Sequence, residues 1–218
     1  GPMLPVLRVS ERIALEAGTV WWDADLFSGV PDWEKLLAFE VRGLTAEEQE
    51  FLDGPVQELC GRLDEWQVQQ AGDLPPEVWT LLKERGFFGM IIPKRYGGLE
   101  FSAAAHSAVI TKLASRSVTA AVTVMVPNSL GPSELLLHYG TDEQKQHFLP
   151  LLARGAEIPC FALTGPETGS DAAATQSSGL VCRREYQGHE TLGICLNWHK
   201  RYVTLGPVAT LIGLAFRL

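Results

Sequence analysis

The 218-residue sequence lacks the marks of several large classes of protein. Its four cysteines are widely spaced and form no CxxC pair, which argues against a zinc ribbon. Its five histidines show no HxxxH or HExxH spacing, so packing explains them better than a metal site. No apolar run reaches the roughly 18 residues of a membrane helix. The net charge of −8, without any basic patch, argues against a nucleic-acid partner.

The remaining composition is that of a globular protein that keeps its thiols reduced. Hydrophobic residues make up 46% of the chain and charged residues 20%, enough for a sizeable core in one or two domains. Gly1 and Pro2 before Met3 are typical of a scar left by cleavage of an expression tag. No signal peptide is present, which favours free cysteines and a cytoplasmic location.

Residues 1–44 are predicted to be this scar followed by an irregular arm. Trp21, Trp22 and Trp33 lie between turn signals within the arm. We expect these tryptophans to pack the arm onto another part of the protein, with stacking on a ligand as the alternative.

Residues 45–157 are predicted to form an all-helical N-terminal domain with short connections. Thr45 with Glu48, and Thr141 with Gln144, have the spacing of a capping box, in which two side chains satisfy N–H groups at the start of a helix. These two patterns predict helix starts at both ends of the domain.

Apolar spacing and breaking residues predict the elements in between. One helix face is expected to carry Leu52, Val56, Leu59, Leu63 and Trp66, with a break or kink at Gly54-Pro55. Further signals are Pro76, Ser102 and Ser117 as helix starts, Phe87–Pro93 as a buried connector or short strand, Tyr96–Gly98 as a turn, and Pro150 as the restart of the last helix.

From residue 158 the pattern changes to strands, so the fold class is α+β, with residues 158–218 as an incomplete β domain. The predicted strands are Cys160–Leu163, Gly179–Tyr186, Thr191–Asn197, Arg201–Leu205 and Ala209–Phe216. Val208–Leu214 is almost wholly apolar, so we expect both of its faces to be covered. A natural domain that ended there would leave a hydrophobic edge unpaired, which makes this an odd place for a domain to end.

The most informative stretch runs from Cys160 to Asp171. It is a strand that ends in a polar loop broken by glycine and proline. Such a loop lets bare backbone approach a large planar or phosphorylated ligand.

Six motifs, in order and at matching spacing, make the chain resemble the acyl-CoA dehydrogenases, from about Gly18 to the last residue. The match is closest to the large bacterial long-chain enzymes of fatty-acid β-oxidation. The motifs are Gly18–Asp23, Tyr96–Ser102, Val126–Pro132, Tyr139–Lys145 followed by Leu149-Pro150, Ala162–Asp171, and Lys200–Leu205.

The resemblance implies a helical domain, a β domain and a C-terminal helical bundle, with the present chain truncated before that bundle. It implies an FAD-dependent enzyme that oxidises fatty acyl-CoA to trans-2-enoyl-CoA and passes electrons to an electron-transfer flavoprotein. We expect the full-length protein to be a homo-oligomer. Related large enzymes can carry a hydrophobic segment ahead of this region, so association with the inner membrane stays open beside the cytoplasmic location.

The resemblance also assigns a first flavin-binding segment, which begins at Phe161. Leu163 would pack against the flavin ring, and the Thr164 hydroxyl would bond to its polar edge. Gly169 and Ser170 would lie where the cofactor and the thioester ligand approach the loop, which makes Ser170 a substrate-binding residue as well.

A second flavin-binding segment is assigned to Tyr202, Val203 and Thr204. Tyr202 would cover a ring face, and the Thr204 hydroxyl would lie near the nitrogen that accepts the hydride. The alternative is an ordinary strand pair, because Tyr and Thr both favour β-structure.

The chain departs from the common family pattern at two positions. Most of the family has Glu where Gly165 stands, whereas the large bacterial subgroup has a small residue there. Most members also have Trp at the position of Tyr202. Glu167 and Asp171 resemble a pair of acid/base carboxylates, but the resemblance implies that they are structural residues of the loop.

No catalytic residue is predicted, because the family's base is a glutamate of the C-terminal bundle, beyond Leu218. We therefore expect that this chain alone neither dehydrogenates acyl-CoA nor holds FAD tightly. Two alternatives remain open: a non-catalytic binding or scaffold module with the same fold, and an acyl-CoA oxidase.

Overall fold

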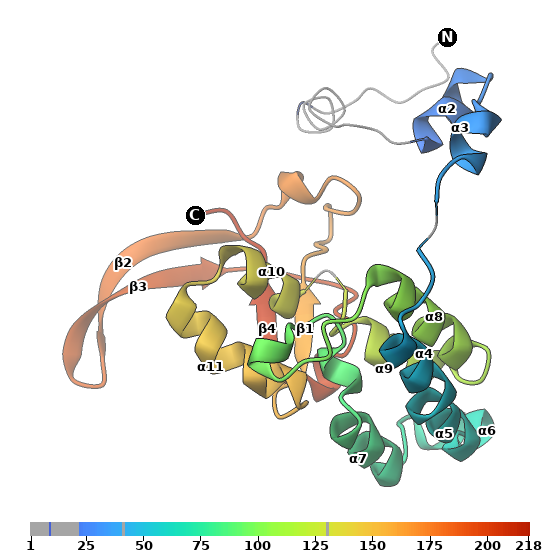
Figure 1. Cartoon of the computed structure of the whole chain (residues 1–218). Coiled ribbons are helices and arrows are strands. Elements are labelled where there is room, and N and C mark those ends of the chain that lie inside the picture. The colour runs from blue at the N-terminus through green and yellow to red at the C-terminus, as the bar shows by residue number, and fades with distance from the viewer. Residues whose placement is uncertain (1–8, 10–21, 41, 130) are drawn as a thin grey trace. The chain divides into compact units, whose positions relative to one another are not determined.

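The computed structural model describes residues 9, 22–40, 42–129 and 131–218 (Figure 1). The motif positions from Gly18 to Trp21, and Leu130, lie outside these residues. The chain divides into two compact units, and each is described by itself. The helical unit comprises Gly43–Thr164 and Lys200–Ala215, and the hairpin unit comprises Gly1–Arg42, Gly165–His199 and Phe216–Leu218.

The first helix of the helical unit, α4 (Ala46–Asp53), begins at the predicted capping box. The Glu48 N–H donates to Thr45 Oγ1 at 3.2 Å, and the Thr45 N–H donates to Glu48 Oε2 at 2.8 Å. The second carboxylate oxygen of Glu48 accepts from the Ser102 N–H at 2.7 Å. Glu48 is buried, so its carboxylate joins the start of α4 to the start of α8 (Ala103–Ala114).

The segment expected to be one apolar helix face is divided among three helices. The predicted break is confirmed, because α4 ends before Gly54 and α5 spans Pro55–Arg62. A third helix, α6 (Glu65–Ala71), starts where the Asp64 carboxylate accepts from two N–H groups of the next turn. The prediction was wrong for Trp66, which is 71% exposed, because this new start turns its side chain away from the core.

The other predicted helix starts are confirmed. The Ser102 hydroxyl caps α8 by accepting from the Ala105 N–H at 3.2 Å. The Ser117 hydroxyl caps α9 (Val118–Met125) by accepting from the Ala120 N–H at 3.1 Å. The prediction that the last helix restarts at Pro150 was wrong, because the helix continues through this residue. Proline lacks an N–H group and so removes one main-chain hydrogen bond of the helix, which does not end it here. The remaining helices are α7 (Pro76–Glu84), α10 (Pro132–Tyr139) and α11 (Asp142–Ala153), which has its own capping box.

The connector Phe87–Pro93 passes through the core without forming a strand. Its first part is a 3₁₀ turn, η1 (Phe87–Gly89), and a second turn, η2 (Lys94–Tyr96), follows it. The predicted turn at its end is confirmed, and Gly97 has a φ of +83°. A Cβ at Gly98 would lie 2.0 Å from the carbonyl oxygen of Ile92, so only glycine fits there.

Two strands complete the helical unit, β1 (Pro159–Ala162) and β4 (Leu211–Leu214). They pair in parallel, with Pro159 opposite Leu211, and lie side by side next to α10 (Figure 1). The expectation that both faces of the last apolar stretch are covered was wrong, because Ile212 is 54% exposed. A Cβ at Gly213 would come 3.1 Å from Pro132 of α10, so α10 packs on the face of β4 that carries Gly213, and Ile212 lies on the other face.

The strand predicted over Arg201–Leu205 is absent from the structure, which forms a turn there. Tyr202 and Leu205 have φ values of +57° and +65°, and a positive φ interrupts an extended path. The 3₁₀ turn η4 (Gly206–Val208) then leads into β4. Since the side chains of Tyr and Leu give no signal for this conformation, the sequence alone favoured a strand.

The hairpin unit contains β2 (Ser178–Tyr186) and β3 (His189–Asn197), which confirm two of the predicted strands and pair with each other antiparallel (Figure 1). Gln187 and Gly188 connect them, and both have a positive φ, as a two-residue type I′ turn requires. A short 3₁₀ turn, η3 (Ala172–Ala174), precedes β2.

The N-terminal arm was expected to be irregular, but two short helices, α2 (Asp23–Ser28) and α3 (Trp33–Leu37), form in it. The Trp22 indole is buried, donates to the Asp32 carbonyl and lies 5.1 Å from the Trp33 ring. In the described residues, Trp22 thus packs within the arm itself. None of the described helices is both long and apolar enough to cross a membrane.

Candidate functional site

The structure brings the two predicted flavin segments of the helical unit next to each other. The Arg201 N–H donates to the Thr164 carbonyl at 2.9 Å. The Lys200 ammonium donates to the Leu163 carbonyl at 2.8 Å, and burial lowers the pKa of Lys200. The chain after β1 is therefore joined to the chain before η4 by one main-chain and one side-chain hydrogen bond.

The second segment displays an aromatic ring and a hydroxyl group on a tight turn. The Thr204 N–H donates to the Tyr202 carbonyl at 3.0 Å, which closes the turn. Tyr202 is 85% exposed, Thr204 is exposed and Val203 is half-buried. A positive φ at a bulky residue costs on the order of 1 kcal/mol, so the surrounding hydrogen bonds must hold Tyr202 in place.

Phe161 has a different environment from the residues that follow it. It lies on β1 and lines an apolar pocket of about 340 Å³ formed with α10, α11 and β4. Gly213 lies opposite Phe161 in the strand register, and a Cβ there would come 3.2 Å from the Phe161 ring. Phe161 therefore belongs to the packing between the strands and α10.

In the hairpin unit, the polar loop begins with a closed four-residue turn. The Gly165 N–H donates to the Thr168 carbonyl at 3.0 Å, and the Thr168 N–H donates back to the Gly165 carbonyl at 3.3 Å. Thr168 is buried, whereas Gly169 and Ser170 are exposed. A Cβ at Gly169 would meet no atom within 4 Å, so the backbone there is open to a ligand.

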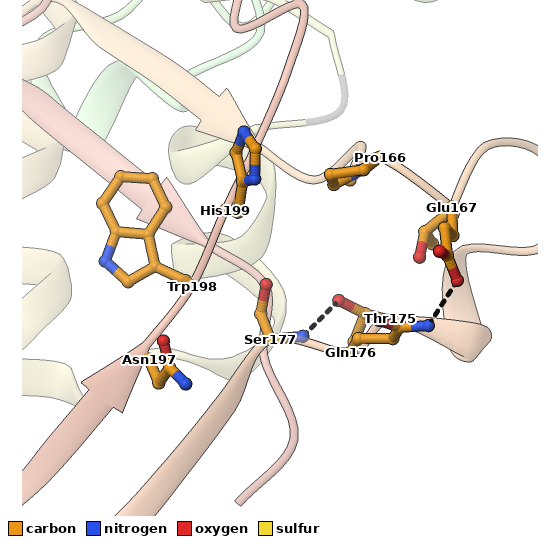
Figure 2. Close-up of a pocket in the computed structure, with 10 residues that line it drawn as sticks. Pro166, Glu167, Thr175, Gln176, Ser177, Asn197, Trp198 and His199 are labelled. Atoms are coloured by element: carbon orange, nitrogen blue, oxygen red, sulfur yellow. Dashed lines mark hydrogen bonds between the residues drawn. The ribbon is translucent and has the colours of Figure 1, made fainter.

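The two acidic residues of the loop take part in local contacts. Glu167 Oε2 accepts from the Gln176 side chain at 2.7 Å, across the loop (Figure 2). The Asp171 carbonyl accepts from the Ala174 N–H at 3.1 Å, where η3 begins. These bonds hold the loop in its conformation.

A pocket of about 300 Å³ lies beside this turn within the hairpin unit (Figure 2). Sequence reasoning missed three of its residues: Asn197, the last residue of β3, and Trp198 and His199, which follow it. The signal that could have revealed them is a polar and aromatic run at a strand end. The full lining is Gly165–Thr168, Thr175–Ser177 and Asn197–His199.

The groups on the two joined segments suit a planar ligand with one polar edge. Thr164 and Thr204 carry hydroxyl groups, Tyr202 offers an exposed ring, and Leu163 and Val203 supply apolar contact. Flavins need this combination of stacking surface and hydrogen-bond donors from the protein. The chemistry of these residues therefore fits FAD.

A comparison with known families decides where the chain belongs. The profile of the acyl-CoA dehydrogenase N-terminal domain matches residues 40–156. The chain belongs to the acyl-CoA dehydrogenase family. The helical domain and the first strands described above agree with this assignment.

The names of similar family members refer to different activities. The chain is 33% identical to a 3-(aryl)acrylate reductase of Clostridium sporogenes, over 66% of the chain and 36% of that protein. It is 34% identical to the probable acyl-CoA dehydrogenase FadE10 of Mycobacterium tuberculosis, over 72% of the chain and 23% of that protein. Family membership therefore leaves the substrate and its chain length undetermined.

Solved structures support the same fold. Glutaryl-CoA dehydrogenase from Mycobacterium smegmatis superposes with a TM-score of 0.65 at 29% identity, and the match covers 80% of the chain. It covers 43% of the glutaryl-CoA dehydrogenase chain. The present chain thus spans less than half of the relatives that it matches.

Proposed function

We propose that this chain is the N-terminal part of an FAD-dependent acyl-CoA dehydrogenase that oxidises long-chain fatty acyl-CoA to trans-2-enoyl-CoA in β-oxidation. The observation that carries the proposal is the junction of the two flavin segments. The bond from the Arg201 N–H to the Thr164 carbonyl places two hydroxyl-bearing segments side by side. Membership of the acyl-CoA dehydrogenase family supports the same conclusion.

Residues on both segments have distinct roles in this proposal. FAD, when bound, would supply the hydride-accepting chemistry of the reaction. The Thr164 hydroxyl donates to the polar edge of the ring system, where negative charge develops, and a donor of this kind is worth roughly 3 kcal/mol in typical sites. The Thr204 hydroxyl would lie near the nitrogen that accepts the hydride. Leu163, Val203 and the Tyr202 ring supply the apolar and stacking contacts.

Three further assignments rest on the family resemblance. Phe161 would begin the first flavin segment from its place on β1, although its ring packs between the strands and α10. Gly169 and Ser170 leave room for the cofactor and for the thioester end of fatty acyl-CoA. Their exposure, and the open space around Gly169, support this role.

Gly165 supports the finer assignment to the large bacterial long-chain subgroup. A small residue at this position distinguishes that subgroup from most of the family. We propose an electron-transfer flavoprotein as the electron acceptor, and a homo-oligomer as the state of the full-length enzyme. The catalytic base would be a glutamate of a C-terminal helical bundle, and no residue of this chain matches it.

The first test is made on the 218-residue chain itself. We expect no turnover of palmitoyl-CoA and only weak retention of FAD, because the base and the opposing wall of the site come from the C-terminal bundle. Absorbance of the purified protein near 450 nm measures bound flavin. A yellow preparation with turnover would show that the site is complete without that bundle.

The second test uses a full-length enzyme that contains this chain. Tyr202→Ala should weaken FAD binding by about tenfold, because a stacked ring contributes roughly 1 kcal/mol or more. Tyr186→Ala, at another exposed tyrosine, is the matched control and should leave FAD affinity unchanged. Equal effects of both variants would refute the stacking role of Tyr202.

Turnover assays on the same full-length enzyme identify its substrate and its electron acceptor. Palmitoyl-CoA should be oxidised faster than short-chain or aryl thioesters, with electron-transfer flavoprotein as acceptor. Rapid oxygen consumption without that acceptor would instead identify an oxidase. Absence of turnover with every thioester, in a protein that holds FAD, would identify a non-catalytic relative.

A further inference from the structure

Two free cysteines face the same side of the β2–β3 hairpin. The strand register places Cys182 opposite Gly193, and Leu180 opposite Cys195. Positions two residues apart on a strand point to the same face, so Cys182 and Cys195 are diagonal neighbours on one face. Twelve residues separate them in sequence, so spacing alone gave no sign of this pair.

The space between the two thiols is open. Both cysteines line a pocket of about 390 Å³ on the hairpin. Gly193, directly across from Cys182, has no side chain, and a Cβ there would meet no atom within 4 Å. Cys195 is exposed and Cys182 is half-buried, and both line this pocket, which is open to solutes.

The diagonal separation decides which chemistry the pair can perform. Diagonal residues of an antiparallel pair lie about 7–8 Å apart, with their Cβ atoms somewhat closer. A disulfide needs Cβ atoms about 3.5–4.5 Å apart, so this pair cannot form one without backbone movement. A metal ion held linearly between two thiolates needs sulfur atoms roughly 4.6 Å apart, twice a typical metal–sulfur bond of about 2.3 Å. Rotation about χ1 can bring diagonal thiols to that separation.

We propose that Cys182 and Cys195 form a binding site for a soft monovalent metal ion, Cu(I), held as a linear bis-thiolate. Thiolates select Cu(I) over hard cations. Binding releases one proton from each thiol and leaves the complex with a net charge of −1. Arg184, on the same strand face, carries the opposite charge. Among the described residues no cluster of three or more His, Cys, Asp or Glu occurs, which disfavours a tetrahedral zinc site here.

The proposal is tested by anaerobic titration of the 218-residue chain with Cu(I) in competition with a chromophoric Cu(I) chelator. We expect one Cu(I) per chain at the tight site and no comparable uptake of Zn²⁺. Cys182→Ser and Cys195→Ser should each weaken Cu(I) binding by about a hundredfold or more, since loss of a ligand exceeds the 10–100-fold cost of losing an outer-shell partner. Cys60→Ser, which removes a thiol from α5 in the helical unit, is the matched control and should bind like the parent chain.

Two rearranged variants keep four cysteines and change only the geometry. Cys195→Ser with Ile194→Cys moves one thiol to the opposite strand face, and tight binding should be lost. Cys182→Ser with Leu180→Cys places two thiols directly opposite each other, and diamide should then oxidise them to an intrachain disulfide faster than in the parent chain. Circular dichroism of each variant reports whether the fold is kept.

The opposite results would overturn the proposal. Parent-like Cu(I) affinity in Cys182→Ser, in Cys195→Ser or in the opposite-face variant would show that the diagonal pair is not the site. Rapid diamide oxidation of Cys182 to Cys195 in the parent chain, detected by peptide mass, would show that the thiols lie too close for a linear ion. These outcomes do not depend on the proposed dehydrogenase function.

Discussion

Apolar side chains have opposite environments in the helical unit and in the β2–β3 hairpin. Leu82 on α7 is fully buried, whereas Leu180 and Leu192 on the hairpin are 72% and 62% exposed. Leu82 lies in the hydrophobic core cluster, where residues of several helices surround it. A two-stranded ribbon has only one neighbour for each strand and cannot cover either of its faces. The comparison teaches that a hydrophobic residue reports burial only when enough partners surround its element.

Charged side chains differ in the same way. Glu48 is buried and accepts from two main-chain N–H groups, so its charge is part of the helical framework. Glu190 on β3 lies 3.6 Å from Arg183, and both side chains are largely exposed. Exposed ion pairs contribute little, because water and salt screen them.

The largest expected difference between the two regions concerns leucine. Leu82→Ala should lower the free energy of unfolding by about 3 kcal/mol, because a cavity remains in a packed core. Leu192→Ala should change it by less than about 0.5 kcal/mol. Urea unfolding followed by circular dichroism at 222 nm measures both. Equal losses would mean that the hairpin face is covered in solution.

Glycine gives the next largest difference. Gly98→Ala should cost about 2 kcal/mol, because its Cβ would lie 2.0 Å from the Ile92 carbonyl oxygen and the core would have to shift. Gly193→Ala on β3 places its Cβ in open space and should be neutral or slightly stabilising. Thermal unfolding of the two variants provides the comparison. A neutral Gly98→Ala would show that the turn after η2 relaxes easily.

The smallest difference concerns the glutamates. Glu48→Gln should cost about 1.5 kcal/mol, because two N–H groups lose a charged acceptor. Glu190→Gln is the matched control and should cost much less. Urea unfolding at neutral pH measures both variants. A loss of stability as large in Glu190→Gln as in Glu48→Gln would contradict the assignment of Glu48 to the framework.

The charge of Glu48 also predicts a dependence on pH. The N–H groups of Ser102 and Thr45 lower the pKa of this carboxyl from 4.5 to about 2. The folded state therefore binds this proton less readily than the unfolded state does. The stabilisation from Glu48 is present above pH 4.5 and is lost as the pH falls through about 2. Glu48→Gln should accordingly reduce the slope of unfolding free energy against pH in this range.

Local signals predicted the helices well. The two capping boxes, and the caps at Ser102 and Ser117, were found because their partners lie three residues away. The two hairpin strands were predicted because turn-forming residues lie next to each strand pattern in the sequence. These features depend on short stretches of chain, so no knowledge of the tertiary structure was needed.

Features that depend on distant residues were missed or misjudged. The positive φ of Tyr202 follows two residues that bond to the distant Leu163 and Thr164 carbonyls, and the side chain of Tyr202 gives no signal for it. The exposure of Trp66 was misjudged for a local reason, because a helix start at Asp64, two residues before it, competes with the apolar spacing. For the candidate site, the resemblance named the flavin segments, but their junction required the structure. The flavin roles of the individual residues and the domain boundary at residue 157 stay predictions.

The parallel pairing of β1 with β4 has a consequence for the order of events on the ribosome. About fifty residues separate Pro159 from its partner Leu211. At a synthesis rate of roughly 5–20 residues per second, β1 waits several seconds before β4 exists. During that interval the edge of β1 lacks this partner while the nascent helices can already fold. The β1–β4 pairing is therefore a late step when the chain folds during synthesis.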